Sequence, residues 1–204
     1  MAIKLISDLH FGHTNLLKFE RRLFDTIEEH DNYIITSINK AVKNTDTLYI
    51  LGDIGNVEKV RQLNGRKIFI MGNHDKRPIK EYEAYFAEVY DKPIFFRKDI
   101  LLSHEPCPVP LGTLNIHGHL HGSKLANEQH YNVSAHVIDY APIDITFFYN
   151  YVAKLPKGSE KFLEEWYANE YTFLAPRGDV VSDPNGRVLL SETKRLRAKL
   201  FNNE

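Results

Sequence analysis

The sequence predicts an α/β (α+β) fold in which two β-sheets are flanked by helices. Two patterns in the 204 residues lead to this expectation. In the first half, short apolar runs alternate with helical segments, which is typical of an open α/β sheet. In the second half, apolar runs follow one another closely with no good helix between them. This spacing favours a second, more antiparallel sheet.

Three strands are expected in the first half, and polar residues follow each of them at once. The apolar runs and the residues that end them are 3–7 before Asp8, 47–51 before Gly52-Asp53, and 67–71 before Gly72-Asn73-His74-Asp75. Ligands bind beyond the carboxyl ends of the strands in open α/β sheets, so these three strand ends are candidates for one site.

A long helix is expected between the first two of these strands. Its start is marked by two candidate capping-box pairs, Asp25/Glu28 and Thr26/Glu29. Apolar side chains then recur at helical spacing, at Ile27, Ile34, Ile35, Ile38 and Val42. Residues 57–63 also have a helical pattern.

The apolar runs of the second half are 94–97, 100–103, 114–116, 132–138 and 145–151. The last run contains Phe147-Phe148-Tyr149-Asn150-Tyr151. We interpret it as an alternating strand with one face in the core, in preference to a base-stacking surface or a dimer contact.

The chain is expected to divide near residues 150–158. Residues 1–152 would form the main domain, and residues 153–204 a C-terminal appendage with a helix at 159–169, a hairpin at 180–190 and a final helix. The appendage contains a basic stretch at 194–199, which could touch nucleic acid. However, residues 154–204 hold nine basic and eight acidic side chains, which favours a solvated helix face.

Composition narrows the class of protein and the kind of site. The 26 Lys and Arg residues balance 27 Asp and Glu residues, which argues against a protein that coats DNA. A single cysteine excludes an intrachain disulfide framework and a thiolate zinc cluster. No leader pattern and no apolar run of membrane-spanning length is present, so we expect a soluble, cytoplasmic protein. Ten histidines imply that any metal is held by imidazole and carboxylate groups.

Five short clusters carry residues with metal-binding chemistry. They are Asp8-Leu9-His10, Gly52-Asp53, Gly72-Asn73-His74-Asp75, His104 and Gly118-His119-Leu120-His121. Each cluster alone is a weak signal, because such pairs are common in loops. Together they supply oxygen and nitrogen donors that suit Mn, Fe, Zn or Ni.

In this order the clusters resemble the five blocks of the calcineurin-like metallophosphoesterases, which read D-x-H, G-D, G-N-H-D, H and G-H-x-H. The chain looks closest to the small bacterial and phage-type members, which resemble it in the opening 8–15 and in the stretch 132–140. The resemblance covers about residues 1–150 and makes residues 1–152 the catalytic domain. It implies a four-layer sandwich of two mixed β-sheets flanked by helices, the calcineurin-like phosphoesterase fold.

The resemblance also implies a site with two divalent metal ions, for which Mn is favoured and Fe, Zn and Ni are alternatives. The implied ligands are Asp8, His10 and His121 for one ion, Asn73, His104 and His119 for the other, and Asp53 as the bridge between them. A carboxylate suits the bridge because its negative charge offsets the repulsion between two cations.

Four further residues are expected around the ions. The resemblance implies that His74 donates a proton to the leaving group, and that Asp75 orients its imidazole. His13 would contact phosphate or pack in its loop. Arg22 would bind phosphate through its guanidinium or pair with a helix acid at the surface. We expect His117 to support the site or pack on its strand, while His30, His130 and His136 carry no spacing signal.

The function implied is that of a dinuclear metal-dependent phosphoesterase, which hydrolyses phosphate esters by attack of a metal-activated hydroxide. The compact chain favours a small nucleotidic or cyclic phosphodiester as substrate. The alternatives are a phosphomonoesterase, acting on proteins or nucleotides at the same site, and a non-catalytic metal-binding scaffold of the same fold. The charge balance does not indicate nucleic acid as a partner, no membrane contact is expected, and a homo-oligomer is left open.

Overall fold

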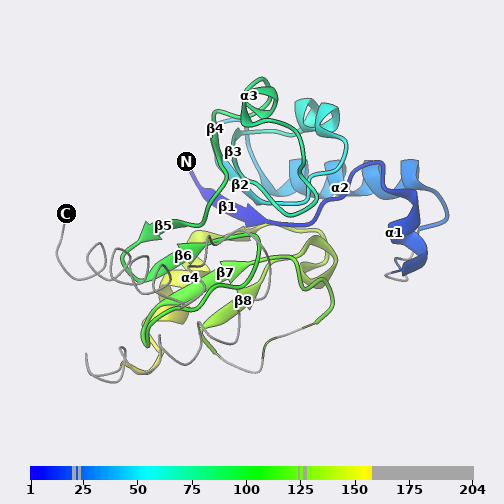
Figure 1. Ribbon diagram of the computed structural model, residues 1–204. Helices are drawn as coiled ribbons and strands as arrows, with labels where there is room; N and C mark the ends of the chain where they lie inside the picture. Colours follow the sequence, from blue (N-terminus) through cyan, green and yellow to red (C-terminus); the bar gives the residue numbers. More distant parts are fainter. Residues whose placement is uncertain (20–21, 23, 124, 126–127, 158–204) are drawn as a thin grey trace, which may run out of the picture.

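A computed structural model of the chain describes residues 1–19, 22, 24–123, 125 and 128–157 (Figure 1). The helix at 159–169 and the hairpin at 180–190 that the sequence predicts lie outside the described residues, as does almost all of the expected appendage. No helix in the described part of the chain is long and apolar enough to cross a membrane.

The first sheet has five strands in the order β4-β3-β2-β1-β9. Their bounds are β1 Ile3–Ile6, β2 Thr47–Leu51, β3 Arg66–Ile70, β4 Glu88–Tyr90 and β9 Ile143–Asp144. The first four strands run parallel, and β9 pairs antiparallel with β1. The three strands that the sequence predicts in this half are therefore neighbours, and their carboxyl ends meet at one edge.

The second sheet has four strands in the order β5-β6-β7-β8. Their bounds are β5 Ile94–Arg97, β6 Ile100–Leu102, β7 Leu114–His117 and β8 His130–Asn132. Only β5 and β6 pair antiparallel, whereas β6, β7 and β8 run parallel. The expectation of a more antiparallel sheet is wrong because the long loops after β6 and β7 carry the chain back to the end where the previous strand began.

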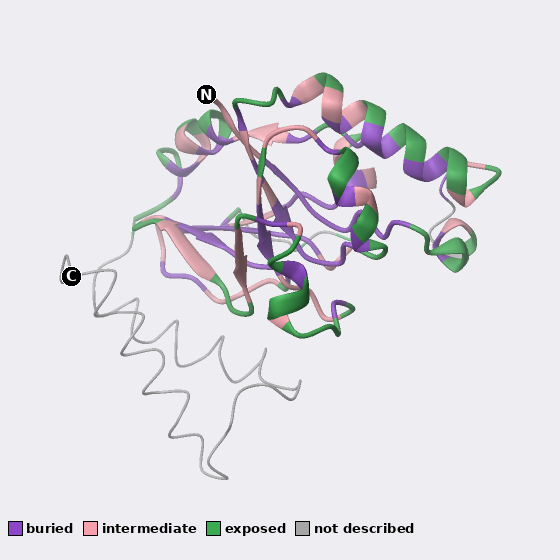
Figure 2. Ribbon diagram, turned by 90° about the horizontal axis from the view of Figure 1, so that it is seen from above, coloured by how far each residue is buried: buried purple, intermediate pink, exposed green. Residues whose placement is uncertain are grey.

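The long helix α2, Ile27–Ala41, begins at one of the two capping pairs offered by the sequence. The Thr26 side chain accepts a hydrogen bond from the Glu29 amide at 3.1 Å, which satisfies one of the free donors at the helix start. Ile34, Ile35 and Ile38 form the buried stripe that faces the first sheet, and exposed residues alternate with them along the helix (Figure 2). The shorter helices are α1 Thr14–Phe19, η1 Val57–Gln62, α3 Ile79–Tyr82 and η2 Ala135–Ile138.

The run 145–151, expected to be a strand, forms helix α4, Ile145–Val152. The Asp144 side chain caps it by accepting from the Thr146 amide at 3.0 Å. The buried residues are Ile145, Phe148 and Val152, a spacing of three and four that fits one face of a helix. A short run that is almost wholly apolar shows no clear period, so periodicity alone does not separate a helix from a strand here.

Two apolar clusters hold these elements together. On β1, Ile6 packs in the cluster shared with α2, while Leu5 faces the other way into the cluster shared with the second sheet and α4. This alternation is what a strand buried on both faces produces. The protein is thus an α+β sandwich of two mixed sheets with helices (Figure 1).

Candidate metal centre

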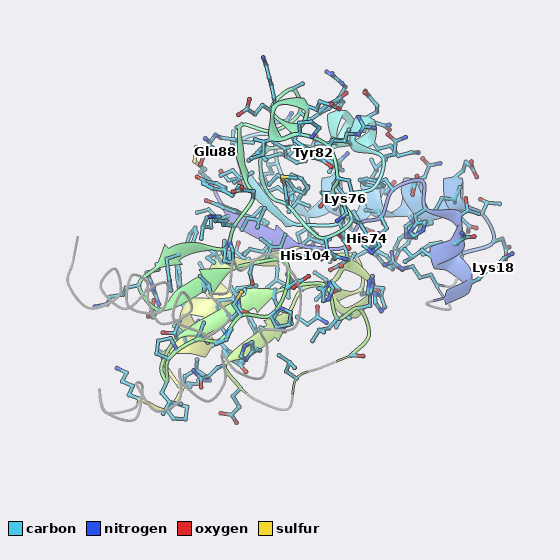
Figure 3. All side chains as sticks on the ribbon, in the orientation of Figure 1. Lys18, His74, Lys76, Tyr82, Glu88 and His104 are labelled. Carbon is cyan, nitrogen blue, oxygen red and sulfur yellow. The ribbon has the colours of Figure 1, made fainter. Side chains whose placement is uncertain are left out.

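The predicted site residues come together where strands of both sheets end. Loops after β1, β2, β3, β6 and β7 supply them in order: Asp8 and His10, Asp53, Asn73 and His74, His104, and finally His119 and His121. In Figure 3, His74 and His104 lie in the central region where the two sheets approach one another. Donor atoms from different loops lie within 4.8 Å of one another, so the loops converge.

The first group of donor atoms consists of Asp8, His10 and His121, whose ligand atoms all lie within 4.8 Å of one another. Nε2 of His10 is 3.9 Å from Asp8 Oδ1, and Nε2 of His121 is 4.0 Å from the same oxygen. The two imidazole rings stack with their centroids 5.2 Å apart. This is the group expected to hold one ion.

The second group consists of Asn73, His104 and His119. Asn73 Oδ1 lies 2.9 Å from His104 Nε2 and 3.1 Å from His119 Nδ1, and the two ring nitrogens are 3.3 Å apart. Atoms that share one ion at about 2.0–2.2 Å stand about 3 to 3.5 Å from each other. The spacing of this group therefore fits a single cation.

The tautomer of His104 makes this fit more specific. Its Nδ1 lies 2.8 Å from the carbonyl oxygen of Leu51, which only accepts, so Nδ1 carries the proton. In the neutral imidazole, Nε2 then has a lone pair directed at Asn73 Oδ1, another lone-pair atom. A cation between the two atoms would be attracted to both lone pairs. In addition, a hydrogen bond from the other ring nitrogen to a backbone carbonyl is a usual way to orient a metal-binding histidine.

Asp53 lies between the two groups. Its Oδ2 is 3.5 Å from His10 Nε2 in the first group and 3.5 Å from His104 Nε2 in the second. This oxygen is buried and has no hydrogen-bond partner, although buried carboxylate oxygens normally have one. Its other oxygen accepts from the His74 amide at 2.9 Å. One carboxylate oxygen is thus held by the backbone, while the other is directed at both groups.

The backbone at the site is strained in a pattern that follows the predicted ligands. Seven non-glycine residues in the described part of the chain have positive φ, and five of them are predicted ligands: Asp8, His10, Asp53, His119 and His121. Each such residue costs of order 1 to 3 kcal/mol and persists only where the surroundings over-determine it. The fold therefore retains strain at the residues that present donor atoms.

The pKa values of two of the donors, Asp8 and His119, are shifted toward the forms that bind metal. Burial opposes ionisation of Asp8, yet the nearby imidazoles, led by that of His104, and a hydrogen bond from Ser7 hold the pKa of Asp8 below its usual value. Burial, together with the His104 ring, lowers the pKa of His119. An ionised aspartate and a neutral imidazole are the forms that coordinate cations.

Two residues that the sequence reasoning did not single out support the first group. Ser134 Oγ lies 2.8 Å from Asp8 Oδ2, and the Asn132 amide donates to the carbonyl of His121 at 2.7 Å. Asn132 Oδ1 in turn accepts from the Ser134 amide at 2.9 Å. The sequence marks them in the same way as the other loops, because they are polar residues at the end of a strand, β8.

Asp75 does not have its expected contact. Its two oxygens accept the backbone amides of Asp53 and Gly72, both at 2.7 Å, and of Ile54 at 3.1 Å. Among the described residues, no hydrogen bond joins Asp75 to the His74 imidazole. Because three amides already occupy the carboxylate, Asp75 ties the β2 and β3 loops together instead of orienting that ring.

Arg22 also differs from expectation. Only 6% of the residue is exposed, so the expected ion pair with a helix acid at the surface is not formed. Its Nη1 lies 2.7 Å from His30 Nε2, and its Nη2 is 3.4 Å from the carbonyl oxygen of Asp8. The sequence around Arg22 does not predict its burial, because the contacts come from the buried face of α2.

Three further histidines lie around the donor groups, two at the rim of the site and one beneath it. His13 and His74 are exposed, and their rings lie 5.6 and 5.7 Å from that of His10, centroid to centroid. They therefore line the open side of the site. His117 is buried and its Nδ1 donates to the Gly118 carbonyl at 2.8 Å, so it packs beneath the loop that carries His119 and His121.

The fold and the site together define a two-sheet α+β protein with a cluster of aspartate, asparagine and histidine donors at its strand ends. No protein-family model matches the chain. It is 33% identical over 172 residues to the uncharacterized protein MJ1445 of Methanocaldococcus jannaschii, covering 74% of this chain and 92% of that protein. The chain therefore belongs to the same family as MJ1445.

Two other proteins are similar to the chain. The Gene 66 protein of Mycobacterium phage L5 is 40% identical over 78 residues, which cover 34% of this chain and 37% of that protein. The crystal structure of AQ665 from Aquifex aeolicus, a protein of unknown function, matches with a TM-score of 0.61 and 30% identity, over 73% of this chain and 98% of that one.

Substitution of Gly118 by alanine should disrupt the first group. A Cβ atom there would lie 1.9 Å from Ser7 Oγ and 2.2 Å from Asp8 Oδ2, so the loop or the carboxylate has to move. We expect Gly118→Ala to lose at least one bound Mn²⁺ per chain and about 1 to 3 kcal/mol of stability. Gly122→Ala is the matched control, because its nearest contact is 3.5 Å away. Equal metal content in both variants would contradict the geometry.

His117 should make the metal-free protein less stable in mild acid. Burial lowers the pKa of His117 to about 4, whereas an unfolded chain has about 6.5. Between these values the unfolded state binds the extra proton, so the free energy of unfolding falls as the pH falls.

From pH 7 to pH 5, wild type should lose about 2 kcal/mol more than His117→Asn, in which the titrating ring is gone. Urea denaturation in the presence of a chelator measures this difference, and the other nine histidines are common to both proteins. Identical pH dependence in the two proteins would show that His117 does not titrate as described.

Proposed function

We propose that this protein is a dinuclear metal-dependent phosphoesterase with the calcineurin-like, four-layer phosphoesterase fold. The observation that carries the proposal is the position of Asp53 Oδ2, buried without a hydrogen bond and 3.5 Å from an imidazole nitrogen of each donor group. A carboxylate oxygen shared by two groups of donors is the arrangement expected of a site for two cations.

The donor set supports the proposed ion pair. Asp8, His10 and His121 would hold one divalent ion, Asn73, His104 and His119 the other, and Asp53 would bridge them. These are oxygen and imidazole donors, which favour Mn with Fe, Zn and Ni as alternatives. The chemistry that such ions supply when bound is activation of water at neutral pH and neutralisation of charge on the phosphoryl group.

His74 would be the proton donor to the leaving group. Its backbone amide is fixed on Asp53 Oδ1 at 2.9 Å, while its side chain is exposed beside the donor groups. This combination places an imidazole at the rim without using it as a ligand. His13, on the same open side, would contact the phosphate oxygens.

The open rim favours a small nucleotidic or cyclic phosphodiester as substrate. Both His13 and His74 are exposed, so a substrate with groups on either side of the phosphorus could enter. A phosphomonoesterase uses the same donors and is the second candidate. A non-catalytic scaffold is less consistent with this site, since a scaffold needs neither a complete ligand set nor His74 at the rim.

Replacing His74 by alanine should separate metal binding from turnover. His74→Ala is expected to keep two Mn²⁺ per chain but to lose about 10²- to 10⁴-fold in kcat, with the largest loss on substrates with poor leaving groups. Metal content and a leaving-group series measure the two effects. If this variant loses its metal, the role of His74 as a proton donor is wrong.

A substrate panel with Mn²⁺ tests the proposed function as a whole. It would contain 2′,3′-cyclic and 3′,5′-cyclic nucleotides, dinucleotides, nucleoside monophosphates and short RNA, with mono- and bis-nitrophenyl phosphate as references. We expect hydrolysis of diesters by wild type and loss of activity in Asp53→Ala. Activity that survives in Asp53→Ala would point to a contaminant or another site, and a clear preference for monoesters would favour the second candidate.

A further inference from the structure

We propose that Arg22, His30 and Asp31 form a positioning unit, which holds the loop of residues 8–12 in the conformation that presents its metal ligands. The inference rests on the proposed metal centre but concerns residues outside it. None of the three is one of the proposed metal ligands, and His30 and Asp31 belong to the buried side of α2.

The hydrogen bonds within the unit can run in only one direction. An arginine guanidinium only donates, so His30 Nε2 accepts from Arg22 Nη1 at 2.7 Å. The proton of the neutral ring is then on Nδ1, which donates to Asp31 Oδ1 at 3.0 Å. His30 is fully buried and thus connects a buried cation to a buried carboxylate through a single defined tautomer.

The two outer members of the unit, Arg22 and Asp31, form hydrogen bonds with the two ends of the loop. Arg22 Nη2 donates to the carbonyl oxygen of Asp8 through a long contact of 3.4 Å. Asp31 Oδ2 accepts from the amide of Gly12 at 3.0 Å. His10, the loop's other predicted ligand, lies between these two anchors. A change at His30 would therefore reach both ends of the loop.

The loop needs such anchors because its conformation is strained. Asp8 has φ 57° and His10 has φ 48°, values that non-glycine residues adopt at a cost. Backbone bonds from Asp8 to Gly52 and from His10 to Asp53 hold the loop on the β2 side. The positioning unit supplies the hold on the opposite side, toward α2.

The surroundings of the unit also favour a fixed geometry. Lys59 Nζ lies 3.1 Å from Asp31 Oδ2 and supplies a countercharge at the surface end. The rings of Phe24 and Tyr140 meet His30 edge-on, with centroids 5.3 and 6.1 Å away. Apolar surroundings strengthen the hydrogen bonds that they enclose. They also raise the free-energy cost of leaving a polar group there without a partner.

Calorimetric titration of the metal-free 204-residue chain with Mn²⁺ tests the unit without requiring any activity. We expect His30→Ala and Arg22→Lys to weaken one of the two binding events by about 10- to 100-fold, the usual effect of removing a partner that orients ligands. The weakened event should be the one that His121→Ala abolishes. His30→Gln, whose amide oxygen can still accept from Arg22, should recover most of the affinity.

Ile34→Ala is the matched control for a general loss of stability. Ile34 is fully buried on the same side of α2, one turn further on, and its side chain has no hydrogen-bonding group that could hold the loop. It should lower Tm and leave both Mn²⁺ affinities within about threefold of wild type. Wild-type affinity at both sites in His30→Ala and Arg22→Lys, or an equal loss in Ile34→Ala, would overturn the positioning role. A wild-type chain that binds fewer than two ions would instead overturn the proposed metal centre, and the inference with it.

Discussion

The arrangement of the site depends on one buried carboxylate, that of Asp53. Its backbone amide is held by Asp75 at 2.7 Å, and its backbone carbonyl accepts from the His10 amide at 2.9 Å. Oδ1 accepts from the His74 amide, and Oδ2 faces two imidazoles. A buried carboxylate oxygen in this position is costly unless a donor or a cation meets it, and Oδ2 has no hydrogen-bond partner.

The backbone around Asp53 is tightly packed and leaves little room for change. The loops approach one another so closely that a Cβ atom on Gly52 would lie 2.3 Å from His104 Nδ1, where no side chain fits. Gly52 also has φ 90°, which favours glycine independently. The parallel strands supply rigid ends, and the loops supply the strained residues. The cost of that strain is met by the two apolar clusters that pack the sheets against α2 and α4.

Much of the site could be predicted from sequence because it depends on local order along the chain. A short apolar run followed by Asp8, Asp53 or Asn73 marks a strand end, and parallel neighbours bring such ends together. What could not be predicted depends on contacts between distant segments. Arg22 is buried by α2, and Asp75 is occupied by amides of the β2 and β3 loops. The direction of β7 and β8 follows from loop paths, which carry no periodic signal.

The central claim is that Asp53 bridges two cations, and anomalous diffraction from crystals grown with Mn²⁺ tests it most directly. The account requires two anomalous peaks, one on each side of Asp53 Oδ2 and about 3.5 to 4 Å apart, the first near Asp8, His10 and His121 and the second near Asn73, His104 and His119. A single peak, or two peaks that share no oxygen of Asp53, would contradict it.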